Sequence, residues 1–374
     1  MRTLVTGGAG FIGSHLVDRL LDRGDEVVVL DNLDPQVHAD REVPRNLTHR
    51  LDNPGLRFVR GDVRDQEAVE GTLDGVEAVV HLAAAVGVGQ SMYRPSYFTD
   101  VNVAGQGRIM ESMARRAGSI HRFVVASSMS IYGEGAYECV EHASVFPRPR
   151  PVEQLANGCW EPLCPVCRAP LEPRATAEGK PTQDTSIYAV TKKAQEELAL
   201  SFGRAYGLPT AALRFFNVYG SRQALSNPYT GIAAIFMSRL KNGNPPLLFE
   251  DGLQSRDFIH VADVADAVLA ALDGDVVGAF NVCTGRPTPI GAVASALAKR
   301  MGVALEPTVI GRYRAGDIRH CYGDPTRAME SLRFRSRVGL EEGLDELLAW
   351  ASREAAADRV ESGIAELEGH GLVR

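Results

Sequence analysis

The feature that most constrains this chain is a glycine-rich turn directly after its first apolar run, in the sequence TLVTGGAGFIG at residues 3–13. Such a turn needs glycine because its backbone angles are closed to other residues and because the backbone must approach a pyrophosphate closely. Apolar residues then recur at helical spacing from Phe11 to Leu21. The stretch therefore predicts a strand, a tight turn and a helix whose N-terminus can hold phosphate groups. Its glycines fit the dinucleotide-binding pattern in two overlapping registers, formed by Gly8, Gly10 and Gly13 or by Gly7, Gly10 and Gly13.

The segment after this helix completes the pattern. Gly24 ends the helix, residues 26–30 (EVVVL) read as a buried strand, and Asp31 stands at the end of that strand. A carboxylate there can accept hydrogen bonds from an adenosine ribose. Residues 32–34 contain no Lys or Arg, so a 2′-phosphate would meet negative charge, and we expect NAD rather than NADP. The alternative is a glycine-rich turn that binds no ligand.

The composition is that of an ordinary globular protein, with 45% hydrophobic and 23% charged residues among 374. A net charge of −7 argues against nucleic acid or an anionic membrane as the main partner. No run approaches the roughly 18–20 apolar residues of a transmembrane helix. The N-terminus enters a strand at once, so we expect no signal peptide. We therefore expect a cytoplasmic protein whose six cysteines stay reduced.

Strand-like and helical stretches alternate through the first 133 residues and resume at Ser186. Repeated βα units predict an α/β fold, a Rossmann-type doubly wound parallel sheet with ligands at the carboxyl ends of its strands. Residues 134–181 interrupt the alternation, because they are rich in Pro, Arg and Glu and contain four of the six cysteines. We interpret them as an insertion into the fold.

A tyrosine and a lysine four residues apart, Tyr188 and Lys192, stand near the start of the helix that follows the insertion. Positions i and i+4 share one face of a helix, so the ammonium group lies near the phenol. The pKa of a free tyrosine is about 10. A nearby cation, joined by the positive nicotinamide of NAD, favours the phenolate and lowers that pKa. The pair, with a serine at the end of a preceding strand, predicts a base that removes a proton from a sugar hydroxyl while hydride leaves the same carbon.

Eight motifs together give the chain a family resemblance. It resembles the extended short-chain dehydrogenases/reductases, and among them the NAD-dependent epimerase/dehydratase family, over nearly everything outside 134–181 and the tail. The motifs are TGGAGFIG at 6–13, DN at 31–32, GDV at 61–63, ASSMSIYG at 126–133, YAVTK at 188–192, RFFNVYG at 214–220, SRDFIHVADVA at 255–265 and RAGDIRH at 314–320.

The resemblance implies a role for each matching position. Ser128 hydrogen-bonds the reacting hydroxyl, Tyr188 is the base and Lys192 is its partner. Arg256 is placed on the diphosphate of a nucleotide sugar, which suits the planar, forked guanidinium group. Cofactor contacts are implied for Gly7, Gly10, Phe11, Ile12, Gly13, Asp31, Asn32, Asp62, Val63, Leu82, Ala83, Ala84, Asn102, Ser127, Tyr188, Lys192 and Phe215. Substrate contacts are implied for Met129, Ser130, Asn217, Arg256, Arg314 and Asp317.

The two residues after Ser128 distinguish among the reactions of the family. Dehydrating members carry Asp and Glu at these positions, and decarboxylating members carry Glu at the second. Here the two residues are Met129 and Ser130, neither of which can shuttle a proton at neutral pH. The resemblance therefore implies 4-epimerisation, in which carbon 4 of the sugar is oxidised and then reduced on its other face.

Four segments also resemble the subfamily of dTDP-L-rhamnose 4-epimerases: residues 31–38, 83–92, 128–135 and 222–231. In UDP-galactose 4-epimerases a lysine that helps to hold the cofactor pyrophosphate stands where this chain has Val86. We therefore expect a dTDP-6-deoxyhexose as substrate. The alternatives are a UDP-hexose or UDP-uronate 4-epimerase, or a ketoreductase or dehydratase of the same family.

The insertion contains two short metal-binding patterns, Cys139-x-x-His142 and Cys164-x-x-Cys167. Two such pairs form the ligand set of a closed, tetrahedral structural zinc site. A segment this small has too little core to fold unaided. We expect a zinc-ribbon-like insertion, with Cys159 as a spare cysteine outside both pairs. Unligated cysteines remain the alternative, and Cys283 and Cys321 are expected in the core.

Two hypotheses of other kinds remain open. The protein could be a non-catalytic dinucleotide sensor, against which the presence of Ser128, Tyr188 and Lys192 argues. The arginines of the insertion, such as Arg148 and Arg150, could face phosphate or an acidic protein partner, although such arginines are more often solvated. A homodimer is implied by the resemblance alone.

The resemblance and the insertion together predict how the chain is divided. We expect an NAD-binding Rossmann core at 1–133, a zinc-ribbon-like insertion at 134–181, the core continued with the catalytic helix at 182–216, a smaller substrate-binding domain at 217–256 and 283–350, a return to the core at 257–282, and a solvated or subunit-contacting helical tail at 351–374.

Overall fold

A parallel sheet of seven strands forms the centre of the protein, in a computed structural model that describes residues 1–38, 42–229, 231–314 and 316–374. The strand order is β13-β9-β5-β4-β1-β2-β3, and it reverses direction beside β1, as the doubly wound prediction requires. Thr230 and Ala315, which belong to two of the segments noted above, lie outside the described residues. The strands are β1 (Arg2–Thr6), β2 (Glu26–Asp31), β3 (Leu56–Arg60), β4 (Ala78–His81), β5 (Arg122–Ser128), β9 (Thr210–Phe215) and β13 (Gly278–Val282).

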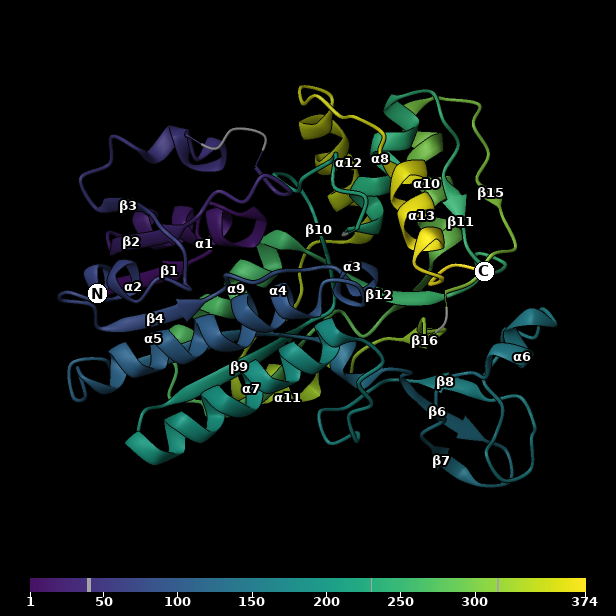
Figure 1. The fold of residues 1–374 in the computed structure, drawn as a ribbon, viewed down its shortest axis with the longest axis horizontal. Helices are drawn as coiled ribbons and strands as arrows, with labels where there is room; N and C mark the ends of the chain where they lie inside the picture. Colours follow the sequence, from purple (N-terminus) through teal and green to yellow (C-terminus); the bar gives the residue numbers. More distant parts are fainter. Residues whose placement is uncertain (39–41, 230, 315) are drawn as a thin grey trace.

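Helices cover both faces of this sheet (Figure 1). Neighbouring residues of one strand enter opposite cores, since Val5 packs with α1 and α9 while Leu4 packs with α2 and α5. One face is covered by α1 (Phe11–Asp22), α9 (Val261–Asp273) and α11 (Thr326–Ser331), and the other by α2 (Gln66–Thr72), α5 (Gly105–Ala114) and α7 (Ile187–Tyr206). Shorter elements are η1 (Arg45–Arg50), α3 (Val88–Ser91), α4 (Pro95–Thr99), η2 (Asp100–Ala104) and η3 (Met129–Tyr132).

A second, smaller lobe has its own core, at the upper right of Figure 1. The helices α8, α10 and α12 pack against strands β10, β11 and β12, which lie between β9 and β13 in the chain. The lobe contains β10 (Asn217–Tyr219), α8 (Ile232–Lys241), β11 (Leu247–Leu248), β12 (Ser255–His260), β14 (Pro287–Pro289), α10 (Ile290–Met301), β15 (Thr308–Val309), β16 (His320–Cys321) and α12 (Leu340–Ala351).

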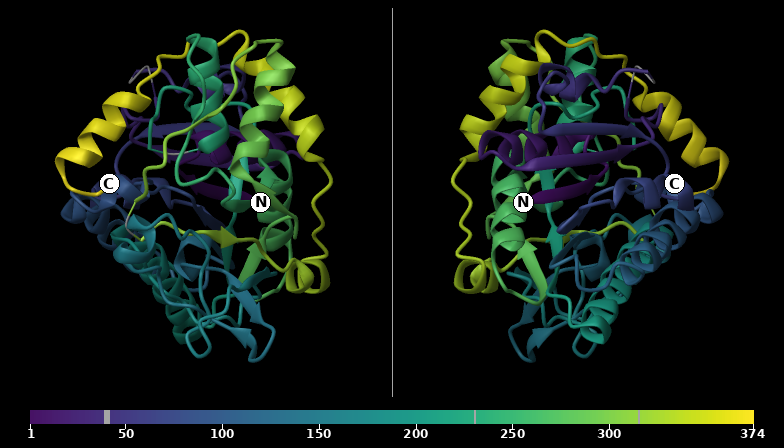
Figure 2. Two further views of the ribbon diagram at one scale, coloured as in Figure 1. Left: turned by 90° about the vertical axis from the view of Figure 1, so that its right-hand side faces the viewer. Right: turned by 90° about the vertical axis from the view of Figure 1, so that its left-hand side faces the viewer.

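The C-terminal helix α13 (Val360–Gly369) packs on its own chain. Its Ile364 and Leu367 are buried, and Leu367 lies close to Gly89. The last residue, Arg374, exchanges two backbone hydrogen bonds with Tyr313. Figure 2 shows this helix in yellow along one edge of the molecule. One face of this helix is thus covered within the chain while most of its residues are exposed, which agrees with the expected solvated helix, and a subunit contact stays a prediction.

The insertion forms a small antiparallel sheet at the lower right of Figure 1. Its strands β6 (Ala136–Cys139), β7 (Ala143–Val145) and β8 (Glu172–Arg174) lie in the order β7-β6-β8, and α6 spans Val152–Ala156. Four buried residues make its core, namely Tyr137, Cys139, Cys164 and Leu171. Cys283 and Cys321 are buried in the main body, as expected. Among the described helices, none has the length and apolar character needed to cross a membrane.

Candidate functional site

A cavity of about 470 Å³ lies at the carboxyl ends of the central strands, between the two lobes. This is where a doubly wound sheet binds its ligands. The cavity is lined by most of the predicted cofactor and catalytic residues, and among the predicted substrate residues by Met129, Ser130 and Asn217. The predicted residues that line it are Gly7, Gly10, Phe11, Ile12, Gly13, Asp31, Asn32, Asp62, Val63, Leu82, Ala83, Ala84, Ser127, Ser128, Met129, Ser130, Tyr188, Lys192, Phe215 and Asn217.

The glycine-rich turn closes one end of this cavity with its backbone alone. Gly7 has a φ of +71°, and a side chain there would lie 2.7 Å from the backbone nitrogen of Ala83. A side chain at Gly13 would clash with the carbonyl oxygen of Gly7. In the described structure no side chain caps the N-terminus of α1, whose first turn contains no acidic residue. Its free backbone N–H groups therefore suit a diphosphate.

Asp31 is held rigidly at the end of β2. Its Oδ2 accepts a hydrogen bond from the backbone nitrogen of Ala9 (3.0 Å), and its Oδ1 accepts one from that of Leu33 (3.0 Å). Burial raises the pKa of Asp31, an effect that the nearby His38 opposes. Asn32 donates to Asp62 over 2.9 Å. These contacts leave a carboxylate at the edge of the cavity, where a ribose of a dinucleotide would lie.

The catalytic candidates meet at the end of β5. Ser128 is the last residue of that strand, and its Oγ accepts hydrogen bonds from the hydroxyl of Ser130 (2.9 Å) and from its backbone nitrogen (3.2 Å). Tyr188 is hydrogen-bonded to Ser128. Burial raises the pKa of Tyr188, and the hydrogen bond to Ser128 opposes this rise. Lys192 is not among the causes of this shift, and its predicted effect together with a bound nicotinamide stays a prediction.

Lys192 instead donates to Oε1 of Gln195 over 2.5 Å. The amide nitrogen of Gln195 is hydrogen-bonded to Nε2 of His81. The other ring nitrogen of His81 lies 2.7 Å from Oγ1 of Thr6. Burial lowers the pKa of Lys192 to about 7, while Glu196 opposes this shift. Burial therefore disfavours a charge on Lys192, even with Gln195 as an acceptor.

Replacing Lys192 by methionine is expected to raise the melting temperature at neutral pH while abolishing activity. The pKa of Lys192 falls from 10.5 to about 7 on folding. Below about pH 7 the folded protein carries a buried charge, and the resulting loss of stability fades as the pH rises from about 7 to about 10.5. Thermal melts without added cofactor should show a gain that is largest at low pH. The matched control is Lys193→Met, on a side chain that is 32% exposed. A gain that increases with pH would contradict this reasoning.

Four predicted contact residues do not line the cavity. Asn102 is buried behind it, where its side chain bonds both backbone groups of Ala85, at 2.8 and 3.1 Å. It holds the cavity wall rather than facing the cavity, because its amide is already paired. The other three form one cluster, in which Asp317 lies 3.2 Å from Arg314 and 3.9 Å from Arg256.

A second wall is formed by the start of β10 and the loop between β10 and α8, and of its residues the sequence predicted only Asn217. Asn217 lines the cavity, and its Oδ1 is buried with no hydrogen-bond partner among the described residues. The same holds for Oε1 of Gln223. A polar ligand would satisfy both atoms. The only other signal of this wall in the sequence was the subfamily resemblance of residues 222–231. Further lining residues that were not predicted include Gln36, Val37, His38, Ala224, Asn227, Tyr229 and Ile232.

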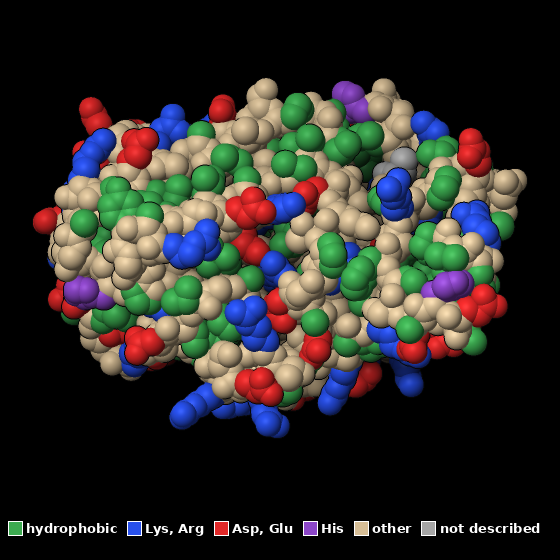
Figure 3. Space-filling model, turned by 90° about the horizontal axis from the view of Figure 1, so that it is seen from below, with side chains coloured by type: hydrophobic (Ala, Val, Ile, Leu, Met, Phe, Trp, Pro, Cys, Tyr) green, Lys and Arg blue, Asp and Glu red, His purple; other side chains and the backbone are tan. Residues whose placement is uncertain are grey.

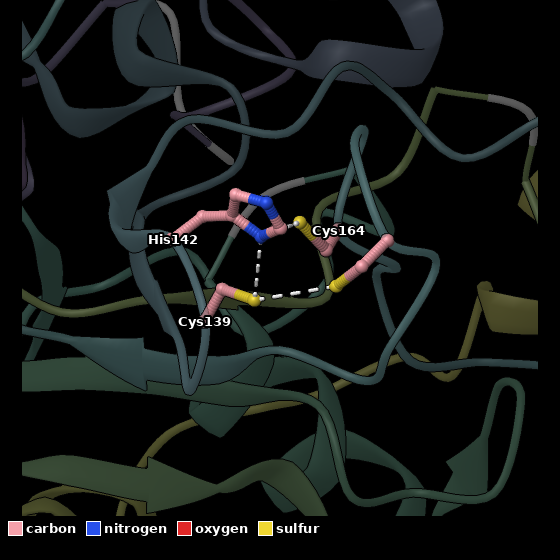
Figure 4. A group of neighbouring side chains, drawn as sticks. Cys139, His142 and Cys164 are labelled. Atoms are coloured by element: carbon pink, nitrogen blue, oxygen red, sulfur yellow. Dashed lines mark hydrogen bonds between the residues drawn. The ribbon is translucent and has the colours of Figure 1, made fainter.

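The four predicted metal ligands come together in the insertion, and Figure 4 labels three of them, Cys139, His142 and Cys164. Their ligand atoms all lie within 4.8 Å of one another. Nδ1 of His142 lies 3.5 Å from Sγ of Cys139 and 3.6 Å from Sγ of Cys164, and the sulfurs of Cys139 and Cys167 lie 3.6 Å apart. A tetrahedral zinc ion with Zn–S of about 2.3 Å and Zn–N of about 2.05 Å requires edges of about 3.6–3.8 Å. The arrangement fits such an ion, whereas Cys159 is exposed and lies outside it.

Comparisons with known proteins agree with this fold. The model of the NAD dependent epimerase/dehydratase family matches residues 3–153 and 166–283. A dTDP-L-rhamnose 4-epimerase from Burkholderia thailandensis is 35% identical over 361 residues, covering 94% of this chain and 95% of that protein. A UDP-glucose 4-epimerase from Thermotoga maritima, solved with UDP-glucose, superimposes with a TM-score of 0.76 at 32% identity, over 94% of this chain and 99% of that one. One from Thermus thermophilus, solved with NAD, gives 0.74 at 32% identity, over 95% and 100%. The chain belongs to the NAD dependent epimerase/dehydratase family.

Proposed function

We propose that this protein is an NAD-dependent nucleotide-sugar 4-epimerase that acts on a dTDP-6-deoxyhexose such as dTDP-L-rhamnose. The observation that carries the proposal is the pair Tyr188 and Ser128 on the wall of the cavity, followed by Met129 and Ser130. Met129 and Ser130 cannot serve as the acid and the base that dehydration of the sugar needs, so the cavity favours epimerisation. The Burkholderia relative supports the sugar, and the glycine-rich turn with Asp31 supports the cofactor.

The residues of the cavity divide the work of the reaction. NAD, when bound, supplies the acceptor that takes hydride from carbon 4 and the donor that returns it. Ser128 accepts both hydrogen bonds from Ser130, so its own hydroxyl hydrogen points to Tyr188 or to the sugar hydroxyl. Burial raises the pKa of Tyr188, which favours its protonated form before the cofactor binds. It becomes the base once positive charge lies beside it, and it returns the proton in the second half of the reaction.

A substrate panel tests this proposal. Purified protein is incubated with dTDP-L-rhamnose, UDP-glucose or UDP-glucuronate, and the sugar region is followed by proton NMR. We expect a second isomer, inverted at carbon 4, from dTDP-L-rhamnose and little or none from the other two. If only a UDP-sugar is converted, the proposed sugar and the proposed thymine nucleotide are both wrong, and the substrate is that UDP-sugar. Conversion of none, by a protein that retains NAD, would overturn the assigned activity.

We further propose that the insertion binds one structural zinc ion through Cys139, His142, Cys164 and Cys167. The geometry of the ligand atoms supports this, and so does the small size of the core around them. Cys159 lies outside the cluster and offers no ligand.

Metal analysis of protein purified without chelator is expected to find one zinc ion per chain. Cys164→Ser should remove it, because the closed site then lacks one of four ligands. Cys159→Ser is the matched control, since this cysteine is exposed and outside the cluster, and should keep its zinc. Wild-type protein without zinc, or a Cys164→Ser protein that binds it unchanged, would disprove the assignment.

We also propose a homodimer that forms through α5 and α7. Three side chains of α7 are both apolar and exposed, namely Val190, Leu198 and Tyr206. On the underside of the molecule, hydrophobic side chains lie in several groups between acidic and basic ones (Figure 3). Pairing of these helices with a second copy would cover the exposed apolar side chains.

A further inference from the structure

The insertion is fastened to the smaller lobe by a group of charged residues that we term the arginine junction. The insertion contributes Glu134, Arg150 and Glu161, and the smaller lobe contributes Glu250, Asp251 and Arg319. The side chains of Arg150, Glu250 and Arg319 are each only 1% exposed. Buried charges are tolerated only when they are paired and hydrogen-bonded, so this contact has a fixed geometry.

Both arginines of the junction donate two hydrogen bonds to a carboxylate across the contact between the insertion and the smaller lobe. Arg150 binds Glu250 through both terminal nitrogens, at 2.9 and 2.8 Å, and also donates to the carbonyl oxygen of Asp317 over 3.0 Å. Arg319 binds Asp251 at 2.6 and 2.9 Å and Glu161 at 2.9 and 2.6 Å. Residues 317–319 are therefore held from the side of the insertion.

Glu134 connects residues 317–319 to the core of the insertion. It accepts hydrogen bonds from the backbone nitrogen of Arg319 at 2.9 and 3.1 Å, and from the hydroxyl of Tyr137 at 2.7 Å. Tyr137 packs in the same four-residue core as the metal ligands Cys139 and Cys164. The position of Glu134 thus depends on a core that the metal cluster closes.

Residues 317–319 in turn fix the orientation of Arg256, the predicted contact to the diphosphate. The guanidinium group of Arg256 donates to the carbonyl oxygens of Ile318 (2.5 Å) and Arg319 (3.0 Å). It also lies 3.9 Å from Asp317, which pairs with Arg314. Arg256 can therefore keep its orientation only while residues 317–319 keep theirs.

We propose that the inserted segment is a brace for nucleotide-sugar binding: its metal-centred core positions Arg256 and Asp317 through Arg150 and Glu134. This inference rests on the proposed nucleotide-sugar substrate and deepens it. The brace acts on the nucleotide end of the substrate, whereas Ser128, Tyr188 and the dinucleotide turn belong to other elements. Loosening the brace should therefore weaken substrate binding more than it slows the chemical step.

Arg150→Met tests the brace, with Arg148→Met as the matched control because Arg148 is an exposed arginine of the same insertion. We expect the KM for the nucleotide sugar to rise about tenfold in Arg150→Met. We expect kcat, bound NAD and bound zinc to change less than twofold, and Arg148→Met to behave as wild type. An unchanged KM in Arg150→Met, or an equal rise in both variants, would overturn the proposal.

Two further measurements keep the test decisive. Glu161→Gln, at a half-exposed carboxylate, weakens the same junction if Arg150→Met does not fold, and the same rise in KM is expected. Chelation of the wild-type metal should raise the KM, and added zinc should restore it. If no sugar nucleotide is turned over, calorimetry with dTDP and with UDP replaces KM, so that failure of the assigned activity is separated from failure of the brace. Equal affinity of wild type and Arg150→Met would then overturn the brace.

Discussion

Tyr188→Phe is expected to lower kcat about a thousandfold, because a positioned acid or base contributes about 10²- to 10⁴-fold and phenylalanine can neither take nor return the proton. Binding should change little, since the ring still fills the same space against Phe98, whose ring centre lies 6.4 Å away. Only the hydrogen bond to Ser128 is lost. The NAD content of the purified protein and the KM should therefore stay near their wild-type values.

The measurement is the rate of epimerisation by NMR, with bound NAD determined from the same preparation. Tyr206→Phe is the matched control, because Tyr206 ends the same helix and is 53% exposed, far from the cavity lining. It should leave the rate unchanged. A Tyr188→Phe protein that keeps most of its activity would rule out the phenol as the base.

Gly13→Ala is expected to remove bound NAD. The new methyl group would clash with the carbonyl oxygen of Gly7 and would lie 2.6 Å from the Cα atom of Gly8, and both are backbone atoms of the turn. The turn must then open, which costs about 3 kcal/mol and weakens the dinucleotide about a hundredfold if the cost falls on binding. The amount of dinucleotide bound to purified protein measures how much of this cost falls on binding. The melting temperature, with and without added NAD, measures how much of it falls on folding.

Gly107→Ala provides the control for this substitution. Gly107 lies inside helix α5, and a side chain there would meet no atom within 4 Å. Alanine favours a helix by up to about 1 kcal/mol over glycine, so this variant should keep its NAD and melt no lower than wild type. Wild-type NAD affinity in Gly13→Ala would show that the turn does not hold the diphosphate.

The sequence by itself determined what depends on short stretches of chain. The glycine turn, Asp31, the Tyr188–Lys192 spacing and the two Cys/His pairs of the insertion are local patterns, because each needs only a few neighbouring residues to adopt one backbone geometry. Alternation of strands and helices was enough to predict the doubly wound sheet, since a buried parallel sheet leaves few other arrangements.

Only the tertiary structure decided how distant segments meet and what burial does to their charges. Burial raises the pKa of Tyr188 and lowers that of Lys192, although their spacing alone predicted that the lysine activates the tyrosine. Packing turned Asn102 toward Ala85 and away from the cavity, and placed Arg150 on Glu250, 100 residues further along the chain. Such outcomes depend on desolvation and on contacts between remote residues, and no local pattern in the sequence encodes them.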